Sequence, residues 1–446
     1  MQVNGSSARH SGALVIGASY RALGIVRSLG RRGIRVGVLT DEHFVAAVSR
    51  YSQFHLPWPA VDEPAQVQYL LDICERRQLE GWAVFPTDDE SAALVARNHE
   101  ILSECFRLTI PGWDVIRWSY DKRLTHRLGS EIGLDQPRTF APKNREDVAT
   151  LECTFPVVLK PAFKHKMNRF THAKAWRVDN REALLSSYDE ACTLVDADII
   201  MIQELIPGGG EDQLSFAAFC VDGRPLAWMT ARRTRQYPMD FGLASSYVES
   251  VDLPEIEAPA RRLLQAMNFT GLVEVEFKRD SRDGRYKLLD VNSRVWGWHS
   301  LGGRAGADFA YLLWQWIHGE AVPEVRARPG VGWIRMATDL AAVLGELLHR
   351  RMSLRQYLRS LRGPVEFAIF AFDDPLPALF DAPFMAWMAW KRRARVERHN
   401  ELDPVAQHRD SPGEPRRRKR SGDDAIRRSV WFQGKNNQTS SDVRVR

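Results

Sequence analysis

The sequence predicts an α/β fold with an α+β part, in which a parallel N-terminal sheet precedes a series of antiparallel hairpins. Residues 13–39 read as strand, glycine turn, helix and strand, and such a βαβ unit implies a parallel sheet. Two later segments, residues 214–235 and 271–292, place apolar strands on both sides of an Asp-Gly turn, which is typical of β-hairpins. The length of 446 residues allows about two to four domains.

The N-terminal part, residues 1–118, is expected to form a small doubly wound, Rossmann-like domain. Its first strand ends at Gly17, and Asp41 follows its second strand, which is a weak imitation of a dinucleotide-binding pattern. The pattern G-x-G-x-x-G would need glycine where Ser19 and Ala22 stand. The match is therefore poor, and the sequence does not favour nicotinamide binding by this domain. The remaining elements are expected at residues 64–77 (helix), 81–85 (strand), 88–98 (helix) and 108–110 (strand).

Charge and cysteine content exclude several classes of protein. Residues 391–446 carry 16 Lys and Arg against 8 Asp and Glu, a balance of +8, so the total of +6 leaves −2 for residues 1–390. A nearly neutral body does not favour nucleic-acid binding. The polar N-terminus and the lack of a long apolar run predict a cytoplasmic protein. The cysteines, none of them in a C-x-x-C pair, suit a reducing compartment; they are Cys74, Cys105, Cys153, Cys192 and Cys220.

The hairpin over residues 271–292 is the candidate metal site. Glu274 and Glu276 alternate with apolar residues in its first strand, so both carboxylates share one face. Asp290 and Asn292 are likewise two apart in its second strand. Carboxylate and amide oxygens are the ligands that Mg²⁺ prefers, and Arg294 just beyond them would favour a bound phosphate. The alternative interpretation is a solvated hairpin with charges on its wet face.

Two lysines are candidates for phosphate binding. Lys122 follows Asp121 at the start of a predicted helix, and Lys160 ends a buried strand, where a lysine is costly unless it faces an anion. The basic stretch 163–169, with Lys164, Lys166 and Arg169, joins two strands and would suit a lid that closes on phosphates. Both features also fit ordinary surface positions.

The segment Gln203–Glu211 and the following hairpin add candidate binding residues. A buried strand runs into Glu204, an apolar pair and a glycine loop, with Glu211 seven residues later. Such an edge can offer backbone groups to a flat ring and a carboxylate to a sugar diol. Arg232 and Arg235, near the end of the next hairpin, could receive a substrate carboxylate or lie on the surface.

Taken together, these motifs resemble the ATP-grasp superfamily, and within it the carboxylate-amine ligase-like members similar to D-alanine:D-alanine and D-aspartate ligases. The resemblance covers roughly residues 10–375 and rests on the order and spacing of several motifs rather than on any single one. The matching segments are Asp121-Lys122, FPVVLKP ending at Pro161, QELIPGGGE from Gln203 to Glu211, EVEF around Glu276, LDVNSR from Leu289 to Arg294, and Gly306–Glu320.

The resemblance implies an ATP-binding role for six residues. The two lysines would contact the phosphates, Glu204 and the backbone of the next two residues would line the adenine slot, and Glu211 would hold the ribose hydroxyls. These residues are Lys122, Lys160, Glu204, Leu205, Ile206 and Glu211.

The resemblance also implies a metal and a catalytic group. Glu276, Asp290 and Asn292 would ligate Mg²⁺, with Mn²⁺ as an alternative, and Arg294 together with Lys160 would stabilise the transferred phosphoryl group. Glu274 stands where some dipeptide ligases have an arginine, so the oxyanion contact must come from elsewhere or the substrate must differ.

The implied reaction is ATP-dependent activation of a small carboxylate as an acyl phosphate, followed by attack of an amine to form an amide or peptide-like bond. Two alternatives stay open: a carboxylase or other acyl-phosphate enzyme on the same fold, and a non-catalytic ATP-binding, membrane-associated scaffold. The sequence names neither substrate and does not indicate an oligomeric state.

The implied domains are the N-terminal domain (1–118), the ATP-grasp domain (119–320), a helical C-terminal extension (321–395) and a disordered basic tail (396–446). The lid is expected at about 150–205 and the metal-binding core at about 206–320. Aromatic residues beside a basic cluster in residues 382–395 would suit peripheral membrane contact, or a terminal helix packed on the body.

Overall fold

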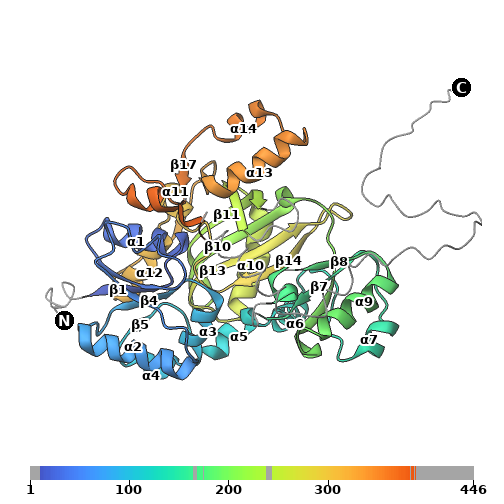
Figure 1. Cartoon of the computed structure of the whole chain (residues 1–446), viewed down its shortest axis with the longest axis horizontal. Helices are drawn as coiled ribbons and strands as arrows, with labels where there is room; N and C mark the ends of the chain where they lie inside the picture. The colour runs from blue at the N-terminus through green and yellow to red at the C-terminus, as the bar shows by residue number, and fades with distance from the viewer. Residues whose placement is uncertain are drawn as a thin grey trace, which may run out of the picture. The chain divides into compact units, whose positions relative to one another are not determined.

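The computed structural model describes residues 11–163, 168–173, 175–237, 244–381, 383–385 and 387. Three sheets organise these residues, and Figure 1 shows the helices that surround them. The fold is mixed α/β, as the sequence predicts. The basic tail, residues 164–167 of the expected lid, and most of the aromatic and basic segment 382–395 lie outside the described residues.

The N-terminal sheet is parallel throughout, with the strand order β3-β2-β1-β4-β5. Its central strand β1 is wholly buried, which fits a sheet covered on both faces. The strands are β1 (Gly12–Ile16), β2 (Arg35–Thr40), β3 (Phe54–Pro57), β4 (Ala83–Pro86) and β5 (Arg107–Leu108). The helices are α1 (Tyr20–Gly30), α2 (Glu63–Arg77), α3 (Asp89–Arg97) and α4 (His99–Ser103).

A second, four-stranded sheet occupies the expected lid region and has the order β6-β9-β7-β8. Its own apolar core includes Leu159, Phe170 and Ile202. The strands are β6 (Thr139–Phe140), β7 (Val157–Pro161), β8 (Trp176–Val178) and β9 (Ile200–Glu204). The helices are α7 (Arg145–Thr150), α8 (Arg169–His172) and α9 (Arg181–Cys192).

The third sheet carries the candidate metal hairpin at its edge. Its order is β14-β13-β10-β11-β12-β16-β17, with β15 paired to β11. The strands are β10 (Gln213–Val221), β11 (Arg224–Tyr237), β12 (Ala244–Val251), β13 (Gly271–Arg279), β14 (Tyr286–Asn292), β15 (Val325–Arg326), β16 (Gly332–Ile334) and β17 (Val365–Phe367). Its helices are α10 (Glu257–Ala266), α11 (Leu301–Ala305) and α12 (Phe309–Ile317).

Two helices, α5 (Trp113–Tyr120) and α6 (Lys122–Glu131), join the sheets. Asp121 accepts a hydrogen bond from the Arg123 N–H and so caps α6, as expected for an acidic residue at a helix start. The Lys122 N–H donates to the Ala162 carbonyl at 2.8 Å. This bond ties the start of α6 to the end of β7, and therefore brings Lys122 and Lys160 into one region.

The C-terminal extension combines helices with short strands that join the third sheet. Helices α13 (Met336–Leu348) and α14 (Leu354–Ser360) are present, but β16 and β17 extend the third sheet. The apolar residues of β16 are buried against β12, which explains why this run pairs as a strand. On β11, Arg235 forms a buried ion pair with Asp339 of α13 at 2.7 Å, and this pair joins the extension to the sheet.

We expect Asp339→Ala to lower the free energy of unfolding by about 3–5 kcal/mol, because it leaves the Arg235 guanidinium buried without its carboxylate. The double variant Arg235→Met with Asp339→Leu removes both charges and should lose less. Urea denaturation measures both values. Asp252→Ala, which removes one end of an exposed pair with Arg326, is the control. Equal losses for Asp339→Ala and Asp252→Ala would contradict the prediction.

Candidate functional site

The register of the β13–β14 hairpin brings the predicted metal ligands together. Glu276 lies opposite Asp290, and Glu274 lies opposite Asn292. The side-chain amide of Asn292 donates to Glu274 Oε2 at 3.1 Å and to Glu276 Oε1 at 3.0 Å. All four side chains therefore belong to one polar cluster on one face of the hairpin, which we call the carboxylate cluster.

The two predicted phosphate lysines lie beside this cluster. Lys122 Nζ donates to both carboxylate oxygens of Asp290 at 2.5 Å. Burial opposes the charged form of Lys122, but the charge and hydrogen bond of Asp290, together with the charges of Asp89 and Glu276, outweigh burial and raise the pKa of Lys122. The pKa of Asp290 is lowered, because Lys122 and Lys160 together outweigh the effect of burial. Lys160 thus acts on the same carboxylate from the end of β7.

Arg294 connects the carboxylate cluster to the N-terminal domain. Its Nε donates to Asp89, the first residue of α3, at 2.5 Å, and its other nitrogens reach Asn292 Oδ1 at 3.2 Å and the Val295 carbonyl at 3.1 Å. Burial opposes its charge, but Asp89 raises the pKa of Arg294. Arg294 is therefore a permanent cation on the border of the cluster.

Glu274 is the most deeply buried carboxylate of the cluster, with 3% of its surface exposed. Ser215 Oγ donates to its Oε1 at 2.8 Å, and the Trp298 indole N–H donates to the same oxygen at 3.1 Å. Burial, reinforced by the charge of Glu276, raises the pKa of Glu274 to about 7. Its oxygens are occupied by protein donors, so Glu274 serves to hold Asn292 and its own strand in position.

Arg233 is a site residue that the sequence prediction missed. Its guanidinium donates to Glu276 Oε1 at 3.1 Å and to Gln213 Oε1 at 3.0 Å, and its side chain is buried. The sequence analysis selected its neighbours Arg232 and Arg235 instead. Arg232 is exposed, and Arg235 is paired with Asp339, so neither faces the carboxylate cluster.

Strand alternation alone could not identify Arg233 as a candidate site residue. Strand alternation around the Asp222-Gly223 turn places Arg232 and Arg233 on opposite faces. The choice between them required the pairing of β11 with β10 and of β10 with β13, which sets Arg233 on the face of Glu276. The irregular register of β11 beyond Arg233 further obscured the alternation.

The predicted adenine edge lies where β9 leaves the smaller sheet. Glu204 accepts the Arg138 N–H at 3.2 Å and pairs with Arg282 at 2.7 Å. The Leu205 N–H donates to the Pro156 carbonyl at 3.3 Å. Glu211 is exposed in a short turn after the glycine loop.

Lys278 fixes the chain just after this edge. Its ammonium donates to the carbonyls of Ile206 at 3.0 Å and Gly208 at 2.7 Å. Gly208 has a φ of +102°, a conformation that favours glycine. The alternation Glu274, Glu276, Lys278 in β13 could have revealed this residue from the sequence.

The oxygen ligands of the carboxylate cluster fit a hard divalent cation. Glu276 and Asp290 supply carboxylate oxygens and Asn292 an amide oxygen, which is the donor chemistry of Mg²⁺ and Mn²⁺ sites. Within the part of the chain that the structure describes, no group of three or more His, Cys, Asp or Glu could hold a metal ion. The candidate ligand set is therefore two carboxylates and one amide, and Lys122, Arg233 and Arg294 already contact oxygens of these side chains.

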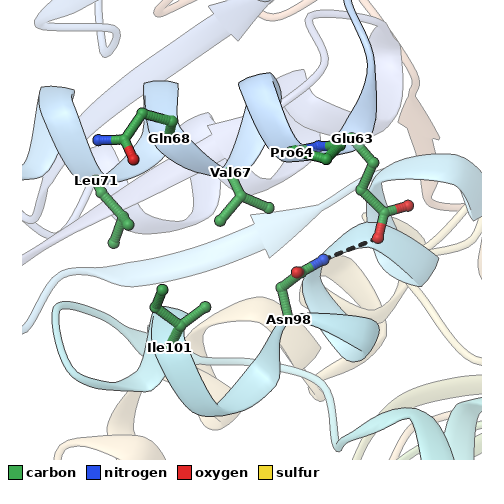
Figure 2. A pocket seen from close by; sticks show the side chains of 7 residues that line it. All are labelled: Glu63, Pro64, Val67, Gln68, Leu71, Asn98 and Ile101. Atoms are coloured by element: carbon green, nitrogen blue, oxygen red, sulfur yellow. Dashed lines mark hydrogen bonds between the residues drawn. The ribbon is translucent and has the colours of Figure 1, made fainter.

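The hollows in the N-terminal part of the protein are separate from this cluster. One of about 350 Å³ lies between α2 and α4, and Figure 2 shows Asn98 donating to Glu63 at one end of it. Aliphatic and polar side chains both line it, and none of the predicted site residues is among them. Its lining residues are Glu63, Pro64, Val67, Gln68, Leu71, Asn98 and Ile101.

The chain is similar to known proteins in sequence and in fold. No family model matches the chain. D-aspartate ligase of Enterococcus faecium is 23% identical over 248 residues, which are 52% of this chain and 58% of that ligase. The chain thus matches less than two thirds of that ligase's length.

Solved structures give the same result. L-amino acid ligase from Bacillus licheniformis superposes with a TM-score of 0.51 at 17% identity, over 68% of this chain and 73% of that one. The biotin carboxylase domain of Hydrogenobacter thermophilus 2-oxoglutarate carboxylase, solved with MgADP and bicarbonate, gives a TM-score of 0.57 at 15% identity, over 72% and 73%. The chain therefore shares the fold of these two enzymes, which is the ATP-grasp fold that its sequence motifs predict.

Proposed function

We propose that this protein is an ATP-dependent ligase that activates a small carboxylate as an acyl phosphate and joins it to an amine. The observation that carries the proposal is the carboxylate cluster, where Glu276, Asp290 and Asn292 are ringed by cationic side chains. Such a site can hold a polyanion close to a second anion, and that is the main electrostatic obstacle to phosphoryl transfer.

Glu276, Asp290 and Asn292 would hold Mg²⁺ or Mn²⁺, which when bound supplies charge neutralisation for the phosphates. Lys122 competes with such a cation for Asp290, because its ammonium already contacts both carboxylate oxygens. Lys122 and Lys160 would bind the phosphates. Glu204, the backbone of residues 205 and 206, and Glu211 would position the adenosine.

Glu274 stands where some dipeptide ligases have an arginine. Arg294 and Arg233 would supply the positive charge of that arginine. Arg294 lies on the side of Asn292 and Arg233 on the side of Glu276, so two cations flank the cluster from different directions. In the first step an oxygen of the substrate carboxylate would bond to the γ-phosphorus while the bond to ADP breaks. The amine nitrogen would then bond to the acyl carbon, and phosphate and a proton would leave.

The similarity to D-aspartate and L-amino acid ligases supports amino acids as the first substrates to test. The similarity to a biotin carboxylase domain supports a second candidate, in which bicarbonate is the carboxylate that is activated. The two differ in the nucleophile and not in the use of the carboxylate cluster.

A phosphate-release screen tests the proposal. Purified protein, Mg²⁺ and ATP are combined with amino acids and sugar acids, singly and in pairs, and with bicarbonate plus amine acceptors. Release that requires one carboxylate together with one amine supports the ligase. Dependence on bicarbonate supports the carboxylase, and nucleotide binding without turnover in any pair would contradict both.

We expect Asp290→Asn to lower ATP turnover by at least about 100-fold with the fold intact, because it removes a charged ligand of the proposed metal site. The matched control is Asp283→Asn, the same substitution at an exposed position in the turn of the same hairpin. Steady-state phosphate release and circular dichroism measure the two effects. Turnover like that of the wild type in Asp290→Asn would remove the metal assignment.

Arg233→Met and Arg232→Met separate two assignments of the substrate arginine. We expect Arg233→Met to lower kcat by about 100-fold or more, with the Kd for ATP nearly unchanged, because its cation lies at the carboxylate cluster. Arg232→Met should change little, because that side chain is exposed on the other face of the sheet. The reverse pattern would restore Arg232 as the substrate residue.

A further inference from the structure

Helix α13 carries apolar residues on its solvent-facing side, unlike an ordinary surface helix. Its solvent-facing side consists of Met336, Ala337, Leu340, Ala341, Leu344 and Leu348, all of them apolar. The exposed fractions rise along the helix, from 50% at Leu340 through 58% at Leu344 to 74% at Leu348. A helix on a water-facing surface normally carries polar residues on that side.

The buried ion pair with β11 fixes this orientation. Asp339 lies on the inward side of α13, where it accepts hydrogen bonds from Arg235 at 2.7 and 3.0 Å and from Ser246 at 3.0 Å. Rotating the leucines inward would expel Asp339 and leave Arg235 buried and unpaired, which is strongly unfavourable. The leucines therefore face outward as a consequence of the packing.

The segment that follows α13 in the chain carries further exposed leucines together with positive charge. In α14, Tyr357 is buried, while Leu354 and Leu358 are 59% and 56% exposed. Between residues 347 and 365 the sequence contains no Asp or Glu, and it contains five arginines. They are Arg350, Arg351, Arg355, Arg359 and Arg362, all of them exposed.

Most of these arginines are available to a partner. Arg351 contacts Glu346 at 3.7 Å. The guanidinium groups of Arg350, Arg355, Arg359 and Arg362 form no hydrogen bond or ion pair with any residue that the structure describes. Several positive charges thus border a surface of exposed leucines without internal compensation.

We propose that α13 and α14 form a docking surface for an anionic lipid bilayer. An amphipathic helix lies in the membrane interface with its apolar side among the acyl chains, and arginines beside it reach the phosphates with their long side chains. None of the described helices has the length and apolar content to cross a bilayer, so the contact is peripheral. Helix α13 packs on β11 and β12, and Figure 1 shows α14 near β17.

Charge favours lipid over a second copy of the chain. In a symmetric dimer the same surface of each copy meets itself, which would bring the arginines of one copy close to those of the other. An anionic bilayer instead attracts each basic residue near its surface. The proposal does not depend on the ligase activity, and it concerns residues distinct from the segment 382–395.

Flotation of the full-length protein with vesicles tests the proposal. We expect the protein to float with vesicles of phosphatidylcholine that contain about one third phosphatidylglycerol, and to bind pure phosphatidylcholine at least about tenfold less. Replacing Leu340, Leu344 and Leu348 by Gln should abolish flotation. Arg355→Glu with Arg359→Glu should remove the preference for anionic lipid.

Two matched variants serve as controls. Val61→Gln with Ile101→Gln removes exposed apolar side chains elsewhere, and Arg76→Glu with Arg77→Glu reverses exposed charges at the end of α2, so both should float like the wild type. Failure of the wild type to float would overturn the proposal, as would flotation that persists in the α13 and α14 variants, which leave residues 382–395 intact. Light scattering that shows a dimer lost in the leucine variants, without flotation, would also overturn it in favour of a second copy.

Discussion

The structure depends on the compensation of buried charge at the β13–β14 hairpin. Glu274, Glu276 and Asp290 lie close together in a largely buried site, where like charges repel more strongly than in water. Lys122, Arg233 and Arg294 offset that repulsion, and they come from α6, from β11 and from the chain just beyond β14. The site thus holds together elements that are far apart in the sequence.

This pairing of buried carboxylates with distant cations also limits how much of the site can be predicted from the sequence. The alternation of Glu274 and Glu276 and the turn at Asp283-Gly284 are local features, so the hairpin and its polar face could be predicted from the chain alone. Lys122 and Lys160 could be proposed because lysines at helix starts and strand ends are conspicuous. The partners that balance them are determined by tertiary contacts, and no local pattern specifies those.

Arg294 and Arg235 show how tertiary contacts decide what the local sequence does not specify. The Arg294 contact with Asp89 spans 205 residues of sequence and joins the hairpin to the N-terminal domain. Arg235 resembles a ligand-binding arginine in the sequence, yet it is used to hold α13, because Asp339 becomes available only when that helix packs on β11. The apolar repeat of α13 predicts a helix that packs on the body through its leucines. The ion pair decides instead that the leucines point away from it.

The hydrogen bonds of Lys278 to the chain between the second and third sheets have a mechanical consequence. Lys278 anchors the carbonyls of Ile206 and Gly208 to the larger sheet, immediately after Glu204. In the smaller sheet Glu204 pairs with Val157, and Lys160 is three residues further along the same strand. Any swing of the smaller sheet about this pivot would therefore displace Lys160 through a wider arc than Glu204, so that the proposed phosphate-binding end of the strand would move more than the proposed base-binding end.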